Sequence, residues 1–179
     1  MGKRDFSLQP FRSAPYDLKI GGHVARHANR LEVRYEITGD LQMIDIPGRK
    51  REASRVKGLW ENTCLELFLA ARDCDRYWEV NLCPSGDWNV FRFDRYDEER
   101  SADKLVEEVL FNSLPVRIQK GSGSFSLAFE LSLDGIIRVD QVIEVGVSAV
   151  TAAPKTYWAL AHCGSMPNFH IRDSFTINL

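Results

Sequence analysis

The stretch Leu59–Leu69, LWENTCLELFL, is typical of a buried β-strand, yet it carries a carboxylate in its middle. Side chains two residues apart on a strand point to the same face. Glu66 therefore shares a face with Cys64 and Phe68, whereas the opposite face is entirely leucine. An ionised carboxylate between two dry faces is strongly unfavourable unless it is paired. Three explanations are open: an arginine partner, a protonated carboxyl group, or a face that forms the floor of a solvent-filled cleft beside Trp60.

The segments that follow show the same division into an apolar and a polar face. In YWEVNL every second side chain is apolar, and CPSGD then turns the chain, as in a β-hairpin, into WNVFRF. We expect these segments to be neighbouring strands, because a short turn joins them. One sheet surface would then carry the following side chains: Glu66, Tyr77, Glu79, Asn81 and Arg92.

Strand-like alternation recurs along most of the chain. RLEVRYEITG and SFSLAFELSL alternate cleanly, and VIEVGVSAV, KTYWALAH and SFTINL are further strand candidates. Eight or more short strands with turns between them predict an all-β protein, an antiparallel β-sandwich of jelly-roll or Ig-like type. We expect a single domain spanning residues 1–179. One short helix is expected around Ala102–Phe111, in a charged segment that is otherwise solvated surface.

Composition narrows the class of protein. Of the 179 residues, 44% are apolar and 27% are charged, which is the profile of a soluble globular domain. The formal net charge of −2 argues against a nucleic-acid partner. No apolar run is long enough to span a bilayer, and the N-terminal residues lack the apolar segment of a secretory signal. We therefore expect a cytoplasmic protein without a membrane partner.

The cysteines and acidic residues contain no recognisable metal motif. The four cysteines form no C-x-x-C pair, and in a cytoplasmic protein we expect reduced thiols, with Cys64 acting as a small buried apolar residue. A catalytic Cys–His pair is the alternative, because its members need not be neighbours in sequence. Asp94, Asp97 and Asp103 are too scattered for a dedicated calcium loop, so we predict no metal site.

A surface of carboxylates, an amide, a guanidinium and aromatic rings has a definite chemical use. Sugars present flat C–H faces that aromatic rings bury, and hydroxyl groups that planar polar side chains bind. Small-ligand clefts combine apolar walls with a few well-placed polar groups in this way. The alternative is structural: Glu66 pairs with Arg92 or Arg172 and fixes the register of the sheet.

The stretch LWENTCLELFL, followed by YWEVNLCPSGDWNVFRFD, resembles the DOMON-like group of β-sandwich domains, which are related to family-nine carbohydrate-binding modules. In that group a tryptophan precedes, by six residues, a glutamate in an apolar strand, as Trp60 precedes Glu66. A hydrophobic-Asn step in the next strand resembles Val80-Asn81, and PNFHIRDSFTINL resembles the group's C-terminal end. The resemblance extends from about Leu31 to Leu179.

This resemblance implies a sandwich that binds sugar or haem in a cleft and performs no chemistry of its own. It assigns Trp60 to one stacking wall and makes Glu66 an acceptor of hydrogen bonds from hydroxyl groups. Sugar-binding members tend to have an arginine where this chain has Glu79, and Arg92 or Arg172 are the candidates to replace it. The opposite wall is expected from the C-terminal third, where the candidates are Trp158, Phe169 and His170.

We therefore predict a non-catalytic domain that binds a small ligand, preferably a carbohydrate, without a cofactor. The predicted ligand-binding residues are Trp60, Glu66, Tyr77, Glu79, Asn81, Arg92, Trp158, His170 and Arg172. Haem held between a methionine and a histidine is an alternative. Its candidate ligands are Met43, Met166, His23, His27, His162 and His170. Two other readings remain: a glycosidase with two catalytic carboxylates, Glu66 and Glu79, and a protein-interaction module, including a homodimer formed through an edge strand.

Overall fold

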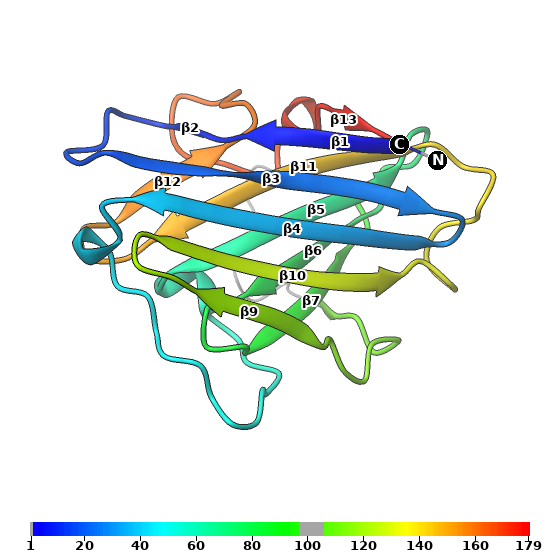
Figure 1. Ribbon diagram of the computed structural model, residues 1–179. Coiled ribbons are helices and arrows are strands. Elements are labelled where there is room, and N and C mark those ends of the chain that lie inside the picture. Colours follow the sequence, from blue (N-terminus) through cyan, green and yellow to red (C-terminus); the bar gives the residue numbers. More distant parts are fainter. Residues whose placement is uncertain (1, 97–105) are drawn as a thin grey trace.

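Two antiparallel β-sheets pack face to face in the computed structural model, which describes residues 2–96 and 106–179 (Figure 1). The predicted β-sandwich is confirmed. The five-stranded sheet has the order β1 (Gly2–Ser7), β3 (Leu18–His27), β4 (Arg30–Gly39), β10 (Ser124–Ser132) and β9 (Val116–Lys120). The eight-stranded sheet has the order β2 (Gln9–Pro10), β12 (Thr156–Ala159), β11 (Ile143–Thr151), β5 (Cys64–Ala71), β6 (Tyr77–Leu82), β7 (Trp88–Phe93) and β8 (Val106–Glu107), and β13 (Ile177–Asn178) pairs with β11.

The hydrophobic core lies between the two sheets and follows from the alternation of the strands. In β5, Leu65, Leu67 and Leu69 are fully buried against the inward side chains of β4 and β10. The core is also crossed by a polar contact, because the Tyr35 hydroxyl donates a hydrogen bond to the backbone carbonyl of Glu66 over 2.7 Å. Burial of the alternate apolar side chains on both sheets is what holds the two layers together.

The helix expected around Ala102–Phe111 falls partly outside the described residues. From Val106 the chain forms β8, whose Glu107 lies opposite Phe91 of β7, so the described part of this segment is strand and turn instead. The helical turns of the described residues are short 3₁₀ segments: η1 (Leu41–Met43), η2 (Leu59–Glu61) and η4 (Arg172–Ser174). In the parts of the chain that the structure describes, no helix has the length and apolar character needed to cross a membrane.

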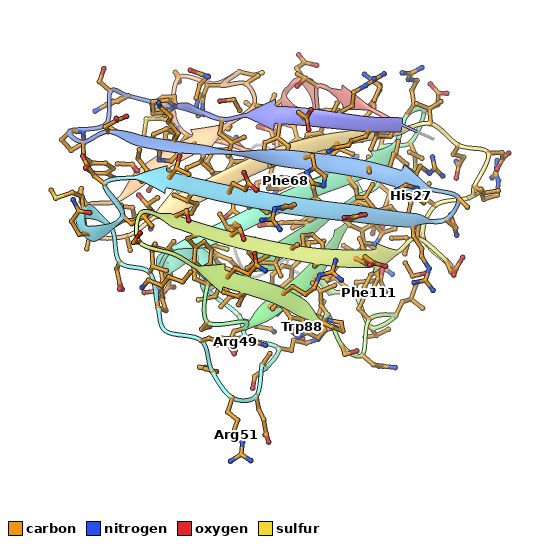
Figure 2. The ribbon with its side chains drawn as sticks, in the orientation of Figure 1. His27, Arg49, Arg51, Phe68, Trp88 and Phe111 are labelled. Carbon is orange, nitrogen blue, oxygen red and sulfur yellow. The ribbon has the colours of Figure 1, made fainter. Side chains whose placement is uncertain are left out.

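A basic loop between η1 and η2 extends from one end of the sandwich, with Arg51 at its tip in Figure 2. The returning limb of this loop is fastened by Arg55. The Arg55 guanidinium donates to Asn89 Oδ1 (3.1 Å) and to the Glu108 carbonyl (3.2 Å), and lies 4.5 Å from the centre of the Trp88 ring. This attachment fixes the approach of the chain to η2, which carries Trp60.

The last segment of the chain, residues 160–176, covers part of the outer face of the eight-stranded sheet, the face directed away from the five-stranded sheet. The Phe175 ring packs 5.5 Å from Phe68 of β5 and 5.8 Å from Tyr77 of β6. Gly146 of β11 makes room for it, because a Cβ atom at this position would lie 2.7 Å from Phe175. A small residue on β11 thus allows the C-terminal segment to pack closely over β5 and β6.

Candidate functional site

Polar side chains from three neighbouring strands meet on the outer face of the eight-stranded sheet. In the strand register Glu66 of β5 lies opposite both Asn81 of β6 and Ser148 of β11, and Glu79 follows on the same face of β6. We call these four side chains the polar cluster. Their common face was expected from the alternation for Glu66, Glu79 and Asn81. It follows from the pairing of β5 with β6, in which side chains point alternately inward and outward.

Hydrogen bonds join the polar cluster internally. The Ser148 hydroxyl donates to Glu66 Oε2 over 2.7 Å, and Asn81 Nδ2 donates to Glu79 Oε1 over 2.9 Å. Glu66 is only 3% exposed and Glu79 only 5%. The expectation that Glu66 faces a solvent-filled cleft beside Trp60 is therefore wrong: its carboxyl group is buried and is bound by a serine.

The environment of Glu66 favours its neutral form. The pKa of Glu66 is raised from 4.5 to about 8, first by burial and second by the nearby Glu79, against smaller lowering effects of the Ser148 hydrogen bond and the Lys155 charge. A buried carboxyl group next to another carboxyl group is expected to hold its proton. Of the three explanations considered for this residue, the structure supports the protonated carboxyl group at neutral pH.

His170 links the polar cluster to the surface of the molecule. Its Nδ1 atom lies 3.0 Å from the Tyr77 hydroxyl, and its Nε2 atom lies 3.9 Å from Glu79 Oε2. The ring makes edge-to-face contacts with Phe68 and Phe93, each with a centroid distance of 5.2 Å. Phe68 itself lies behind the strands of the five-stranded sheet in the view of Figure 2. Aromatic contacts and two polar neighbours therefore set the orientation of the imidazole.

Beyond His170 lies a pocket of about 470 Å³, which we call the outer pocket. Its lining residues are Arg72, Asp73, Cys74, Asp75, Tyr77, Arg95, Tyr96, Glu144, His170 and Arg172. Tyr77 and His170 belong both to this lining and to the contacts around the polar cluster, so the two features are continuous. The volume is in the range of sites that hold small molecules in proteins.

The guanidinium of Arg172 is held rigidly in the wall of the outer pocket. It donates to Glu144 Oε2 from Nε (2.9 Å) and Nη2 (2.8 Å), and to the carbonyls of Ala71 (2.9 Å) and Cys74 (3.1 Å). It also lies 5.3 Å from the Phe175 ring. A planar group with so many fixed partners presents its remaining surface in one orientation. The proposal that Arg172 pairs with Glu66 is wrong, since its carboxylate partner is Glu144.

Two of the predicted site residues lie elsewhere. Arg92 stands opposite Trp78 in the β6–β7 register and therefore points to the other face of the sheet, where it lies 4.0 Å from Asp94. Trp158 stands opposite Ala149 on β11, an inward position, so its indole is only 3% exposed in the core between the sheets. In both cases the parity of the strand position determines the face.

Trp60 packs on the outer face beside Phe91 and is not among the described residues that line the outer pocket. Its half-buried indole makes an edge contact with Phe91 of β7, with a centroid distance of 5.9 Å. The structure thus groups Glu66, Glu79 and Asn81 in one cluster, whereas Trp60 flanks this cluster from the β7 side. Phe169, the other wall candidate, is half-buried near Tyr157 of β12.

The sequence interpretation missed Ser148, Glu144, Arg95 and Tyr96. A signal for the first two was present, because Glu144, Gly146 and Ser148 occupy alternate positions of VIEVGVSAV and therefore one face of β11. Arg95 and Tyr96 follow directly after β7, in a part of the chain without alternation. Their position beside Arg172 depends on how the C-terminal segment folds over the sheet.

The candidate haem ligands are distributed over the molecule. His23 and His27 lie on β3 of the five-stranded sheet, and Met43 ends η1. On the C-terminal segment, His162 Nε2 lies 2.9 Å from the Gln9 carbonyl and Met166 is 67% exposed. Within residues 2–96 and 106–179, no group of three or more His, Cys, Asp or Glu side chains is placed to hold a metal ion.

No protein-family model and no curated protein sequence matches this chain. A solved structure from Bacteroides uniformis ATCC 8492, named "putative carbohydrate-binding protein", is similar in fold, with a TM-score of 0.71 and 12% sequence identity. The match covers 97% of this chain and 83% of that chain. At this level of identity the likeness shows a common β-sandwich fold.

Proposed function

We propose that this protein is a carbohydrate-binding domain without catalytic activity, and that it holds the sugar in the outer pocket. The observation that carries this proposal is the composition of the pocket wall, where the half-buried rings of Tyr96 and His170 stand beside the fixed guanidinium of Arg172. Aromatic rings suit the C–H face of a sugar, and Nη1 of Arg172, which binds the Cys74 carbonyl with one of its two N–H groups, offers a fixed donor to a hydroxyl group.

The charges of the pocket favour an uncharged ligand with many hydroxyl groups. Three arginines line it together with three carboxylates, and Arg172 and Glu144 already pair with each other. Among the described residues of this lining, neither sign of charge is in excess, whereas a phosphate or polyanion would require an excess of positive charge. A balanced set of donors and acceptors is instead what neighbouring hydroxyl groups need.

Two similarities support the same ligand class. The stretches LWENTCLELFL and YWEVNLCPSGDWNVFRFD resemble the DOMON-like group and family-nine carbohydrate-binding modules. The fold is also similar to that of the solved structure named "putative carbohydrate-binding protein". Neither similarity assigns a residue, so the location of the ligand rests on the pocket.

Isothermal titration calorimetry with a panel of neutral mono- and disaccharides tests the proposal. We expect at least one sugar to bind with a dissociation constant in the micromolar to millimolar range. Arg95→Ala and Tyr96→Ala should each weaken binding of that sugar about tenfold, which corresponds to about 1.4 kcal/mol. The matched control is Arg4→Ala, an exposed arginine on β1 of the other sheet, which should leave binding unchanged.

The alternatives give different results in the same set of measurements. Loss of binding in Trp60→Ala, with Arg95→Ala unaffected, would place the ligand beside Phe91 instead of in the outer pocket. Absence of binding heat for every sugar at 10 mM would contradict carbohydrate binding altogether. Hydrolysis of a chromogenic glycoside by the wild type, abolished in Glu66→Gln, would make the protein an enzyme.

A further inference from the structure

Two of the four cysteines, Cys64 at the start of β5 and Cys83 just after the end of β6, lie in one small apolar cluster. The register of β5 and β6 ends with Leu65 opposite Leu82, so one further step places Cys64 opposite Cys83. Cys64 is fully buried and Cys83 is 6% exposed, and both belong to a small apolar cluster with Leu59. The other two cysteines of the chain, Cys74 and Cys163, are exposed.

The backbone hydrogen bonds identify the type of this cross-strand pair. The Cys83 N–H donates to the Asp87 carbonyl (2.8 Å), and the Cys83 carbonyl accepts from the Gly86 N–H (2.9 Å). Both backbone groups of Cys83 therefore point toward β7. Continued by one step, the register therefore makes Cys64 and Cys83 a position of the non-hydrogen-bonded type, in which Cα atoms are typically about 4.5 Å apart and side chains approach closely. Disulfides span Cα distances of about 4.4–6.8 Å.

Both side chains also point to the same side of the sheet. Cys64 shares the outer face with Glu66, and its thiol lies 3.7 Å from Asn81 Oδ1. The Cys83 sulfur accepts from the Ser85 N–H at 3.5 Å, in the turn that follows β6. Burial, followed by the charge of Glu66, raises the pKa of the Cys64 thiol well above its ordinary value, and Cys83 is close enough to contribute to the same shift.

We propose that Cys64 and Cys83 are a redox-modification site that forms a cross-strand disulfide under oxidising conditions. The oxidant is a small-molecule disulfide. The thiolate of Cys83, the less buried partner, attacks one sulfur of that molecule and releases a free thiol. Cys64 then loses its proton, attacks the Cys83 sulfur and displaces the second thiol. Two protein thiols are thus oxidised to one disulfide, and one small-molecule disulfide is reduced to two thiols.

The position of this bond connects it with the polar cluster. The disulfide would join β5 to the end of β6 two residue pairs away from Glu66 and Asn81, three residues after the end of η2. It would also remove the Cys64 thiol as a hydrogen-bond donor to Asn81 Oδ1. The proposal is independent of the ligand, because it depends only on the strand register and on the burial of the two thiols.

The test uses the full chain with both exposed cysteines replaced (Cys74→Ser and Cys163→Ser). One sample is incubated folded with oxidised glutathione, and a second is unfolded in urea and refolded in a glutathione redox buffer, because the burial of Cys64 slows its reaction in the folded state. Free thiols are blocked with N-ethylmaleimide before tryptic digestion without reductant. Trypsin cleaves after Lys57, Arg72, Arg76 and Arg92, which leaves the two cysteines in separate peptides, 58–72 and 77–92.

We expect mass spectrometry to find these two peptides joined, and dithiothreitol to separate them. The melting temperature of the oxidised protein should exceed that of the reduced protein by about 5 °C, because the bond restricts the unfolded chain. The control adds Cys83→Ser, which should abolish both the joined peptide and the difference in melting temperature. Recovery of both peptides from the refolded sample as separate maleimide or glutathione adducts would overturn the proposal.

Discussion

At the scale of single residues, Glu66 shows how a carboxyl group is accommodated in an apolar strand. Its neighbours on the same face are Ser148, which binds it, and Glu79, which repels its charge. The neutral form avoids both the desolvation of a charge and the repulsion between two carboxylates. A neutral acid is thus an integral part of the polar cluster, and the stability of the fold should depend on its proton.

The pH dependence of stability tests this protonation. The pKa of Glu66 is raised in the folded state to about 8 from an ordinary value of 4.5, so the folded state binds the proton more tightly. This contribution to stability is fully present below pH 4.5 and is lost as the pH rises to about 8. Compared with Glu66→Gln, the wild type should lose on the order of 3 kcal/mol in free energy of unfolding between pH 5 and pH 8.

Urea denaturation of both proteins at four pH values between 5 and 8 measures this difference. The pKa values of Asp87, Asp134 and Asp140 are lowered in the folded state, so these groups affect stability at acidic pH, but equally in both proteins. The difference between the two proteins in pH dependence therefore reports the ionisation of Glu66. Parallel curves for the wild type and Glu66→Gln would show that the carboxyl group is ionised in the folded protein.

At the scale of elements, the attachment of the C-terminal segment to β11 depends on a glycine. A Cβ atom on Gly146 would lie 2.7 Å from Cδ1 and 3.1 Å from Cε1 of Phe175. The Phe175 ring in turn packs on Phe68 and Tyr77, next to His170. The close contact between Gly146 and Phe175 therefore positions Tyr77 and His170, which connect the polar cluster with the outer pocket.

Gly146→Ala should lower the free energy of unfolding by about 1–3 kcal/mol, because the added methyl group displaces the Phe175 ring. It should also lower the affinity of the outer pocket for its ligand, because the displaced Phe175 ring would shift His170. The matched control is Gly48→Ala in the exposed loop, where no atom lies within 4 Å of the added Cβ. That variant should remain within about 0.5 kcal/mol of the wild type. Equal stability of the two variants in urea denaturation would contradict close packing at Gly146.

At the scale of the whole molecule, the two sheets are held together by apolar burial and by a contact directly beneath the polar cluster. Tyr35 of β4 is fully buried, and its hydroxyl donates to the backbone carbonyl of Glu66 over 2.7 Å. The five-stranded sheet thus supports the strand that carries the polar cluster. A buried hydrogen bond of this kind specifies how the two layers are placed relative to each other.

Tyr35→Phe keeps the ring and removes only the hydroxyl. We expect the free energy of unfolding to fall by about 1–2 kcal/mol, because the variant leaves a buried carbonyl without its donor from the opposite sheet. Urea denaturation at pH 6 measures this loss, and circular dichroism checks that the sandwich is retained. An unchanged unfolding midpoint would show that the hydroxyl does not contribute to the association of the sheets.

The strands and their faces were predictable because alternation is a local property of the sequence. RLEVRYEITG, SFSLAFELSL and LWENTCLELFL each define an inward and an outward face without reference to any distant residue. For the same reason Glu66, Glu79 and Asn81 were expected on one surface, and the hairpin CPSGD brought β6 and β7 together. The face of Arg92 was also predictable from local sequence. Arg92 occupies alternate positions of the strand with Trp88 and Val90, which point into the core, so it lies on the inward face.

The sequence by itself thus determined the fold class, the faces of the strands and the shared surface of the two glutamates. Only the tertiary structure decided that Trp158 enters the core, that Arg172 pairs with Glu144, and that His170 lies over Tyr77. These facts depend on contacts between residues far apart in the chain, such as the packing of residues 160–176 on β5, β6 and β11. The protonation of Glu66 has the same origin. The pKa of a carboxyl group depends on its burial and on neighbouring charges, and the alternation of one strand does not specify which distant residues supply them.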